Sequence, residues 1–445
     1  MELGRDFDPR VGRRLGALFD GMVRERSVVL RRICPSRCEE VAAQRFLSSP
    51  QVTVSDIFEA GSVGTVRASQ GRRVVVAQDT TEVSFARALR RRGLGPGGDG
   101  RTPGFFLHAL LAVDAQDEAV LGPVGGMIWT RDQEPVSDRK SRAFDKRESR
   151  KWTFGAEEAA ARLKGAGQII LACDQEGDIW ETFVRCPASV TPLVRAQHDR
   201  TLAEKGPSLF ELPRAWLERA RYDISISPRK VGEKARQATI AVKAGAVVIR
   251  RPKTTQEGPP TLALNLVEAM EVSPTPTNAP VRWRLLTTLP IDTAQDVQEV
   301  VRLYKLRWRI EEAFRLLKKD GVGLEETQVQ DLEHLFRVTA IALAAAIQVL
   351  QLVDARDGGP RPMSDLLDPS LIPAVAHIGR KLEGATQRQK NPHPEGSLAW
   401  LSWIVARHGG WKIYGKPPGP KTMAYGVQSF MSVLRGYLTA TGQLP

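Results

Sequence analysis

One short segment constrains the fold and the chemistry of this chain more than any other. Tyr304–Lys318, with the sequence YKLRWRIEEAFRLLK, has apolar residues at helical spacing and predicts one amphipathic helix docked on a core. Four polar residues at spacings of three, four and seven fall within an arc of about 60° on such a helix: Tyr304, Arg307, Glu311 and Lys318. A carboxylate among cations suits a metal ion surrounded by phosphates. A solvated, salt-bridged face uses the same residue types, so the interpretation depends on acidic residues elsewhere.

Two further acids each end a run that predicts a buried strand. VVVAQD ends in Asp79, and QIILACD ends in Asp174. Sites gather at the carboxyl ends of strands in an open sheet, although a lone aspartate there is more often a turn or cap residue. Three converging carboxylates can hold two Mg²⁺ ions about 3.5–4 Å apart, and carboxylate and water ligands suit this ion. Asp79, Asp174 and Glu311 are therefore the candidate metal-binding triad, and Mn²⁺ is expected to substitute for Mg²⁺.

The charge balance of the chain favours a polyanionic partner. Its 445 residues carry a formal charge of +13, and each Lys or Arg that meets a phosphate releases counterions. Four cysteines are too few for a disulfide scaffold at this length. The apolar stretch Val338–Val353 is shorter than the roughly 20 residues of a membrane span and predicts a buried helix. Because the N-terminus also lacks the apolar region of a signal peptide, we expect a cytoplasmic protein without membrane contact.

The order of predicted helices and strands along the chain indicates an α/β protein in five parts. Residues 1–65 are Arg-rich and helical, which suits a DNA-binding domain or any small helical one, and residues 359–445 form a second helical region. Residues 66–195 alternate strands with a helix, and residues 291–358 contain the helix described above. Together these two parts predict a mixed-sheet core. Residues 196–290 have short alternating strands separated by Pro and Gly, which predicts an antiparallel β insertion in that core.

Several elements of the core can be predicted individually. Three runs before the second aspartate predict strands: RRVVVAQDTT, FFLHALLAVD and AVLGPVGGMIWT. Residues Lys151–Lys164 predict a helix. The glycine-rich stretch Gly93–Gly104 has no GK[ST] after it, so it predicts a loop between strands rather than a nucleotide-binding P-loop.

These residues together resemble bacterial insertion-sequence transposases of the DDE superfamily, and specifically the insertion-sequence-four family. That family carries the signature Y-x2-R-x3-E-x6-K after two strands that each end in an aspartate, and none of its four positions is substituted here. The likeness spans nearly the whole chain. It includes QDTTEVSF, KRESRKW, CDQEGDIWE and RWRIEE in the core, QRFLSSPQVTVSDIFEAG near the N-terminus and GSLAWLSWIVARHGG near the C-terminus.

The resemblance implies both a fold and a catalytic centre. The fold is a ribonuclease H-like core, interrupted between the second aspartate and the glutamate by the antiparallel insertion. Asp79, Asp174 and Glu311 correspond to the metal-binding catalytic triad of the family. His108, in GFFLHALL, stands where family members also tend to carry a histidine, and we interpret it as structural.

The resemblance further implies five DNA contacts. Arg307 and Lys318 correspond to residues that contact phosphates near the end of the mobile element. Tyr304 corresponds to the contact with the phosphate of a base flipped out during hairpin formation. Trp283 aligns with the tryptophan that stacks on this base, where stacking is worth about 1–3 kcal/mol, although a Trp in an alternating strand is usually a core residue. Arg195, in LVRAQHDR, resembles an arginine near the DNA end.

The implied function is cut-and-paste DNA transposition. Activated water nicks one strand at each terminal inverted repeat, and the freed 3′-hydroxyl attacks the opposite strand to form a hairpin. A second water opens the hairpin, and the 3′-ends join target DNA. The implied partners are double-stranded DNA and a second copy of the chain, because each protomer would act on the end bound by the other. The helices after Pro373 are the expected contact in this homodimer, which would act on the nucleoid of a bacterium.

Two other functions remain open from the sequence. A non-catalytic DNA-binding derivative, or an inhibitor of transposition, would bind the ends but has no use for three metal-binding acids. A stand-alone nuclease of the ribonuclease H-like class would use the acids. It has no need to stack a flipped base, so Trp283 and Tyr304 argue against it.

Overall fold

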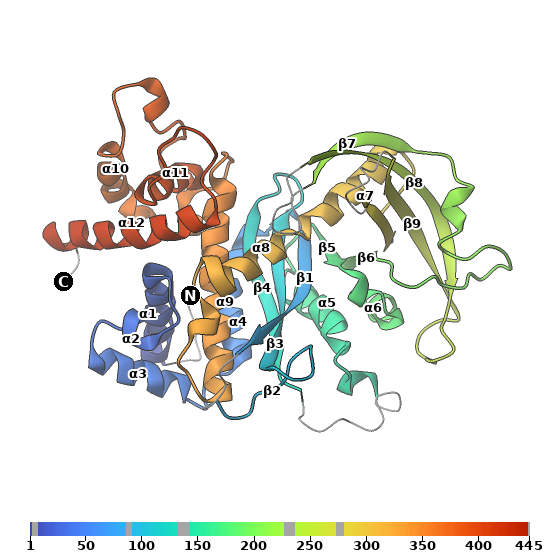
Figure 1. Cartoon of the computed structure of the whole chain (residues 1–445), viewed down its shortest axis with the longest axis horizontal. Coiled ribbons are helices and arrows are strands. Elements are labelled where there is room, and N and C mark those ends of the chain that lie inside the picture. Colours follow the sequence, from blue (N-terminus) through green and yellow to red (C-terminus); the bar gives the residue numbers. More distant parts are fainter. Residues whose placement is uncertain (2–7, 86–90, 132–142, 227–235, 273–279, 444–445) are drawn as a thin grey trace. The chain divides into compact units, whose positions relative to one another are not determined.

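The computed structural model describes residues 1, 8–85, 91–131, 143–226, 236–272 and 280–443. They fold as a mixed α/β protein, with the elements labelled in Figure 1. The chain divides into two compact units. Unit 1 comprises Met1–Arg72, Asp79–Arg139 and Arg309–Pro445, and unit 2 comprises Arg73–Gln78 and Lys140–Trp308. Strand β1 (Arg73–Ser84) contributes its first half to unit 2 and its second half to unit 1.

Unit 2 is built on a sheet in which parallel strands are followed by antiparallel ones. Besides β1, its strands are β5 (Gln168–Cys173), β6 (Val190–Arg195), β7 (Ala220–Ile226), β8 (Arg236–Arg250), β9 (Thr261–Glu271) and β10 (Arg282–Thr287). The first half of β1 runs parallel to β5, and β5 runs parallel to β6. From β6 the order continues through β10, β9, β8 and β7, each paired antiparallel with the one before. The apolar run of β5 is almost completely buried, as expected for a parallel strand covered on both faces.

Among the described α-helices of unit 2, α7 is the one that begins with a side-chain cap. They are α5 (Arg150–Arg162), α6 (Trp180–Val184) and α7 (Ala294–Leu306), with short 3-10 turns at Phe144–Lys146, Gln175–Gly177 and Leu212–Arg214. A capping box starts α7: the Thr293 hydroxyl accepts the Asp296 amide at 3.1 Å, and the Asp296 carboxylate accepts the Thr293 amide at 2.8 Å. The helix then packs on β7, β8 and β9.

Unit 1 is organised around one buried helix, α9 (Leu332–Ala355). By length and composition alone this helix could cross a membrane, but 78% of its apolar window is buried inside the molecule. Helices α1, α4, α8, α11 and α12 and strand β4 pack against it. These partners confirm the buried helix predicted over Val338–Val353. The other helices of unit 1 are α1 (Pro9–Glu25), α2 (Leu30–Ile33), α3 (Arg37–Leu47), α4 (Val54–Ala68), α8 (Arg309–Arg315), α10 (Ile372–Arg380), α11 (Leu398–His408) and α12 (Pro420–Ala440).

The strands of unit 1 form a long hairpin with a small addition at one end. β3 (Pro103–Asp114) and β4 (Val120–Trp129) pair antiparallel with two irregularities in their register, and β1 lies beside β3. A two-residue strand, β2 (Gly95–Pro96), pairs with the start of β3. The stretch predicted as a loop is therefore partly strand. Gly95 is required there, because a Cβ atom would lie 1.8 Å from the carbonyl oxygen of Arg131.

The continuous helix predicted over Tyr304–Lys318 is wrong. Helix α7 ends at Leu306, and the amides of Arg307 and Trp308 each bond to a carbonyl three residues back, at 3.1 Å. This 3-10-like turn breaks the helical ladder, and α8 starts afresh at Arg309. Because the break changes the helical phase, spacing in the sequence no longer defines one shared face.

A second departure from the ideal helix follows α8. Leu316–Asp320 form a π-helical turn, in which bonds run to the residue five positions away. The adjacent Leu316 and Leu317 are both fully buried in this wider turn. The turn packs against α9.

Candidate active site

Two of the predicted acids follow residues of neighbouring strands whose side chains are hydrogen-bonded in unit 2. β1 and β5 run parallel there, and the Gln78 side-chain amide donates to the Cys173 sulfur at 2.9 Å. Asp79 follows Gln78 in the chain, and Asp174 follows Cys173. Asp174 directly follows β5, as predicted, at the edge where open sheets place their ligand sites. Asp79 lies within β1, which continues to Ser84, so the prediction that both acids end their strands is wrong for Asp79.

Unit 2 brings five of the predicted site residues into one cluster, which comprises Asp174, Arg195, Trp283, Tyr304 and Arg307. The rings of Trp283 and Tyr304 meet edge to face with centroids 5.8 Å apart. Tyr304 is 5% exposed, and burial raises the pKa of its phenol. The positive charges of Arg307 and Arg195 act on the same pKa in the opposite direction, and the Asp174 carboxylate raises it. These electrostatic effects require the charges to lie near the phenol.

The elements around this cluster fix its residues from three directions. Tyr304 lies in the last turn of α7, and Arg307 caps that helix with 8% of its surface exposed. Arg195 ends β6, and Trp283 lies on the neighbouring strand β10 and is half-buried. Asp174 caps the 3-10 turn after β5, where its carboxylate accepts the Glu176 amide at 3.0 Å. The arrangement places a carboxylate, two guanidinium groups and two aromatic rings together.

The cysteine before the second aspartate is unsuited to nucleophilic chemistry. Cys173 is fully buried, and burial raises the pKa of its thiol far above the usual value. The thiolate is the reactive form of cysteine, so this side chain stays protonated and acts in packing. The next residue, Asp174, supplies a carboxylate directly after the strand.

Asp79 belongs to unit 1, where a buried histidine supports its strand. The Asp79 carboxylate accepts the Thr80 amide at 2.7 Å. The Thr80 hydroxyl lies 2.9 Å from Nδ1 of His108, a residue of β3 that is fully buried. This hydrogen bond ties β1 to β3 and agrees with the structural interpretation of His108.

Glu311 and Lys318 also belong to unit 1, but on different turns of the chain. Glu311 is half-buried in the first turn of α8, whereas Lys318 lies in the π turn that follows. Burial lowers the pKa of Lys318, and the carboxylates of Glu325 and Glu82 raise it. Tyr304 and Arg307 lie at the end of α7 in unit 2. The prediction that all four residues share one face of one helix is therefore wrong.

The three candidate metal ligands are thus distributed between the units. Asp79 and Glu311 lie in unit 1, and Asp174 lies in unit 2. Among the residues that the structure describes, no three His, Cys, Asp or Glu side chains are grouped to hold a metal ion. The donor chemistry of the three acids still fits Mg²⁺, which accepts carboxylate oxygens and retains several waters.

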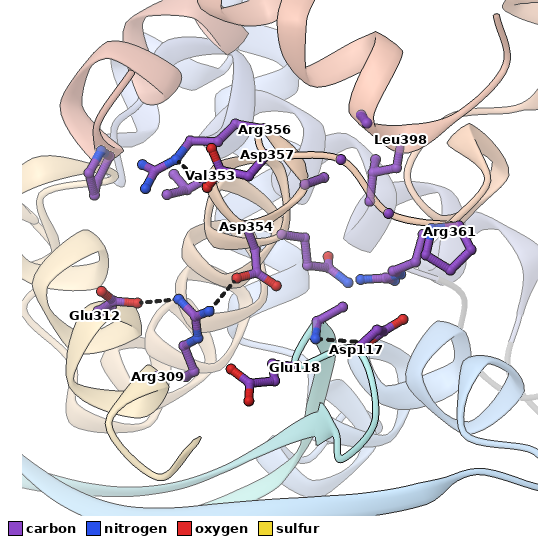
Figure 2. Close-up of a pocket in the computed structure, with 18 of the residues that line it drawn as sticks. Asp117, Glu118, Arg309, Glu312, Val353, Asp354, Arg356, Asp357, Arg361 and Leu398 are labelled. Carbon is purple, nitrogen blue, oxygen red and sulfur yellow. Dashed lines mark hydrogen bonds and ion pairs between the residues drawn. The ribbon is translucent and has the colours of Figure 1, made fainter. Parts of the chain in front are cut away.

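The sequence analysis did not predict a polar cavity in unit 1 that is lined in part by α8. Figure 2 shows this cavity, of about 500 Å³, with Arg309 extended between two acids. Arg309 pairs with Asp354 at 2.8 Å and with Glu312 at 3.3 Å. The other Asp354 oxygen accepts the Val120 amide at 2.8 Å. Since Arg309 stands two residues before Glu311, this network fixes the start of the helix that carries the candidate catalytic glutamate.

A signal for this network exists in the sequence. Asp354 interrupts the end of an apolar helix, where an acid needs a partner. The local sequence pattern cannot identify this partner, because Arg309 is distant from Asp354 in the chain. Burial raises the pKa of Asp354, and the charge of Arg309 lowers it without cancelling the effect of burial.

We expect Asp354→Asn to change how stability depends on pH. Burial raises the pKa of Asp354 above its ordinary value of 3.8, so the folded protein holds this proton more tightly than the unfolded chain. This contribution is fully present below pH 3.8 and is lost as pH rises through the raised pKa. The wild type should therefore lose stability relative to the variant over that interval. Urea unfolding of both proteins at a series of pH values measures the difference, and a difference that grows in favour of the wild type contradicts the assignment.

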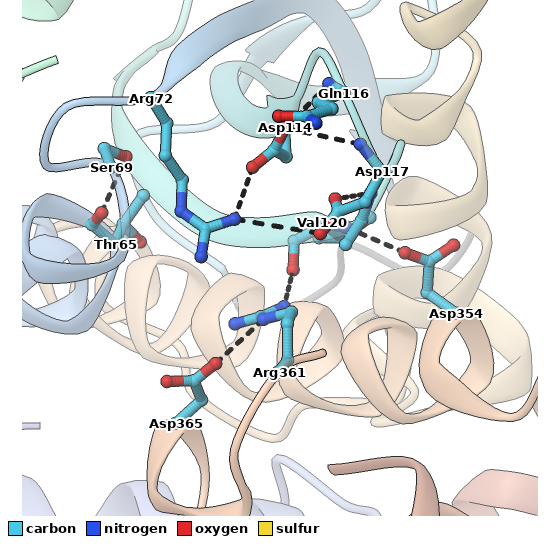
Figure 3. Close-up of polar contacts among 11 residues, drawn as sticks. Thr65, Ser69, Arg72, Asp114, Gln116, Asp117, Val120, Asp354, Arg361 and Asp365 are labelled. Atoms are coloured by element: carbon cyan, nitrogen blue, oxygen red, sulfur yellow. Dashed lines mark hydrogen bonds and ion pairs between the residues drawn. The ribbon is translucent and has the colours of Figure 1, made fainter. Parts of the chain in front are cut away.

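A second set of polar contacts surrounds the β3–β4 turn of unit 1. In Figure 3, Arg72 reaches Asp114 at 2.5 Å and Asp117 at 3.7 Å. Arg361 is 5% exposed; it pairs with Asp365 at 2.8 Å and donates to the Val120 carbonyl. Because each cation has a carboxylate or carbonyl partner, this network reads as structural support for the turn next to the cavity.

The fold and the cluster are consistent with one class of protein, and a comparison with known families supports it. A mixed α/β fold with a large mixed sheet, and with an acid directly after one of its parallel strands, is consistent with a ribonuclease H-like transposase core. Residues 180–347 match the family model described as a transposase DDE domain. The match contains Trp283, Tyr304, Arg307 and Glu311, and it begins after Asp174. It supports a transposase of the DDE superfamily, a class of enzymes that cleave and transfer DNA and generally use divalent metal ions.

Proposed function

We propose that this protein is a cut-and-paste DNA transposase of the insertion-sequence-four type, acting at terminal inverted repeats. Its steps would be strand nicking, hairpin formation, hairpin opening and strand transfer. The observation that carries the proposal is the unit 2 cluster, in which the Trp283–Tyr304 ring pair lies with Asp174, Arg195 and Arg307. Hairpin formation needs an acid at the reacting phosphate, cations for the backbone and an aromatic surface for an unstacked base.

The acidic triad would hold the metal ions at the reacting phosphate. Asp79, Asp174 and Glu311 are proposed as ligands of two Mg²⁺ ions, with Mn²⁺ as a substitute. Two such metal ions would activate the attacking oxygen and stabilise the leaving 3′-oxygen. The acids themselves supply the negative charge and the oxygen donors that position these ions. The network around Arg309 supports Glu311 by fixing the first turn of α8.

The neighbouring side chains would hold the DNA. Arg307 presents a planar guanidinium that matches two phosphate oxygens at once. Lys318 would add a single positive charge, and Arg195 would approach the DNA end from β6. Tyr304 would bind the phosphate of the flipped nucleotide, while Trp283 would stack on its base. A site for hairpin formation would therefore need these cations and aromatic rings in addition to the three acids.

The complete reaction would require a second copy of the chain. We propose a homodimer in which each protomer acts on the element end bound mainly by the other, with the C-terminal helices after Pro373 as the dimer contact. The N-terminal helices of residues 1–65 would bind the terminal repeats, and target DNA would enter after excision. The protein would work in the bacterial cytoplasm on the nucleoid.

Removing the metal is expected to stop DNA cleavage without releasing the ends. The test uses a plasmid that carries the element's own ends, with Mg²⁺, with Mn²⁺ and with EDTA, and denaturing gels that score nicks and fold-back hairpins. Hairpins that require metal support the proposal. Nicks without hairpins favour a simpler nuclease of the same fold, and binding without any cleavage favours the non-catalytic DNA-binding derivative. A gel-shift assay in EDTA checks that the ends remain bound.

A further inference from the structure

A segment near the C-terminus of unit 1, which contains two loops and the helix between them, carries an unusual share of the charge of the protein. Between Arg380 and Lys421 there are eight Lys or Arg residues and two acids, a net charge of +6 out of +13 for the whole chain. The loops connect α10 to α11 and α11 to α12, and they are drawn in orange and red in Figure 1. Six of the cations define the C-terminal basic surface: Arg380, Lys381, Arg388, Lys390, Lys412 and Lys416.

The cations of the C-terminal basic surface are available to a partner. All six are exposed. Elsewhere the exposed arginines of this protein commonly pair with acids, as Arg221 does with Glu218 at 2.6 Å. Within the described ranges, none of the six cations forms an ion pair. The two acids of the segment do not neutralise them: the Glu383 carboxylate accepts the Asn391 amide, and Glu395 stands exposed further along the loop.

Side-chain contacts hold the two loops together as one surface. The Arg388 guanidinium lies 4.8 Å from the centroid of the Tyr414 ring, and Gln389 donates to the Tyr414 hydroxyl at 3.4 Å. Arg407, at the end of α11, donates to one backbone carbonyl in each loop, at 3.2 and 2.8 Å. Cations that are distant in the sequence are therefore presented by one connected structure.

The second loop has a backbone conformation that needs support. Ile413 has a φ of 69°, which a β-branched residue rarely adopts. Gly410 and Gly415 on either side also have positive φ, of 88° and 92°. The loop turns sharply enough to leave Tyr414 with 54% of its surface exposed, between Lys412 and Lys416. Strained segments of this kind are concentrated at ligand-binding sites.

We propose that the C-terminal basic surface binds the phosphate backbone of duplex DNA, independently of base sequence and outside the candidate active site. Duplex DNA offers one negative charge per about 1.7 Å of its axis, so neighbouring cations can meet several phosphates at once. Tyr414 supports the surface by holding Arg388 in place and exposing an amphipathic ring. The proposal rests on the proposed function, because only a protein that handles DNA needs a second, sequence-independent hold on it.

Two other partners fit this surface less well. A second copy of the chain docked on these loops would place like charges opposite each other across a two-fold axis, which is repulsive. The dimer contact proposed above for the region after Pro373 would therefore use its helices and not this surface. A membrane surface is usually bound by an amphipathic helix with an apolar face beside its cations. Here five of the six cations come from two loops and Arg380 ends α10, and the large apolar residues of α11 are buried in the fold. Charge without an apolar face favours a polyanion in solution.

The test measures how DNA binding depends on salt. A triple variant, K390Q/K412Q/K416Q, is compared with K164Q/K205Q/K253Q, which removes the same charge from exposed lysines of unit 2. The probe is a duplex of random sequence without terminal repeats. Each lost phosphate contact lowers the slope of log K against log salt by about 0.9. We therefore expect a slope smaller by about 2–3 and binding weaker by about 10- to 100-fold near 0.1 M salt.

The outcomes separate this proposal from the proposed function. Equal slopes for the two triple variants overturn the DNA surface, whatever the cleavage assays show. A reduced slope in a protein that never cleaves DNA supports the surface and contradicts the transposase. Loss of binding to phosphatidylserine vesicles with unchanged DNA binding overturns it in favour of a membrane, and a changed sedimentation coefficient without DNA overturns it in favour of self-association. Circular dichroism confirms that both variants are folded.

Discussion

Glu311→Gln is expected to abolish strand cleavage while leaving binding to the element ends close to that of the wild type. The substitution keeps the shape of the side chain in the first turn of α8 and removes its negative charge. An amide oxygen is a poorer ligand for Mg²⁺ than a carboxylate, and Mg²⁺ demands near-ideal geometry. Residues that merely support a metal ligand cost about 10- to 100-fold when replaced, so a ligand itself should cost more than about 100-fold.

The readout is the initial rate of nicking on a duplex with one element end, together with the dissociation constant from a gel shift. Glu333→Gln is the control, because Glu333 is an exposed acid in the first turn of α9 within the same unit. It should nick at the rate of the wild type. Asp174→Asn in unit 2 should match Glu311→Gln if the acids act on one phosphate. Nicking by Glu311→Gln at the control rate contradicts the assigned triad, and loss of end binding in parallel with nicking points to a folding defect instead.

The strands of this protein could be predicted because the spacing of apolar residues along a strand reflects which of its faces are buried. The apolar runs before Asp79 and Asp174 became β1 and β5, and the run QIILACD is buried almost throughout. The alternating segments between residues 220 and 287 became β7 to β10 in the antiparallel order that such alternation favours. Burial on one face or on two faces leaves a different period in the sequence, so both kinds of strand were confirmed.

The helix that carries Glu311 could not be predicted from the same kind of pattern. Helical spacing places side chains on one face only if every residue keeps the same backbone conformation. The turn at Arg307–Trp308 and the π turn after Arg315 interrupt that regularity. Neither contains a Gly or Pro that would announce it. The Arg309–Asp354 pair was missed for a related reason, because a contact between distant residues leaves no local period.

The encounter of Trp283 with Tyr304 depended on information that spacing does not hold. One ring stands on β10 and the other at the end of α7, and nothing in either local pattern requires them to meet. The structure brings the two rings to 5.8 Å, and it also places Asp174 close enough to influence the Tyr304 phenol. If a base must leave the DNA stack during the reaction, an aromatic ring beside the catalytic acid could stack on that base.

Trp283→Ala is therefore expected to separate hairpin formation from the first nick. Stacking on an aromatic side chain is worth about 1–3 kcal/mol per base, which corresponds to about 5- to 150-fold in the equilibrium for holding a flipped base. The first nick attacks an intact duplex and needs no flipped base, so its rate should change little. The hairpin step strains the DNA until one base leaves the stack, and its rate should fall by the full factor.

A single-turnover assay on an end-labelled duplex resolves nicked and hairpin products in one gel. Trp283→Phe provides the matched control, because phenylalanine keeps a ring that can stack and should restore much of the hairpin rate. A core role predicts a different pattern: Trp283 is half-buried against Tyr304, so loss of packing would lower nicking, hairpin formation and thermal stability together. A common decrease in all three for the alanine variant would assign Trp283 to the core. A decrease confined to hairpins, reversed by phenylalanine, would place its ring on the flipped base.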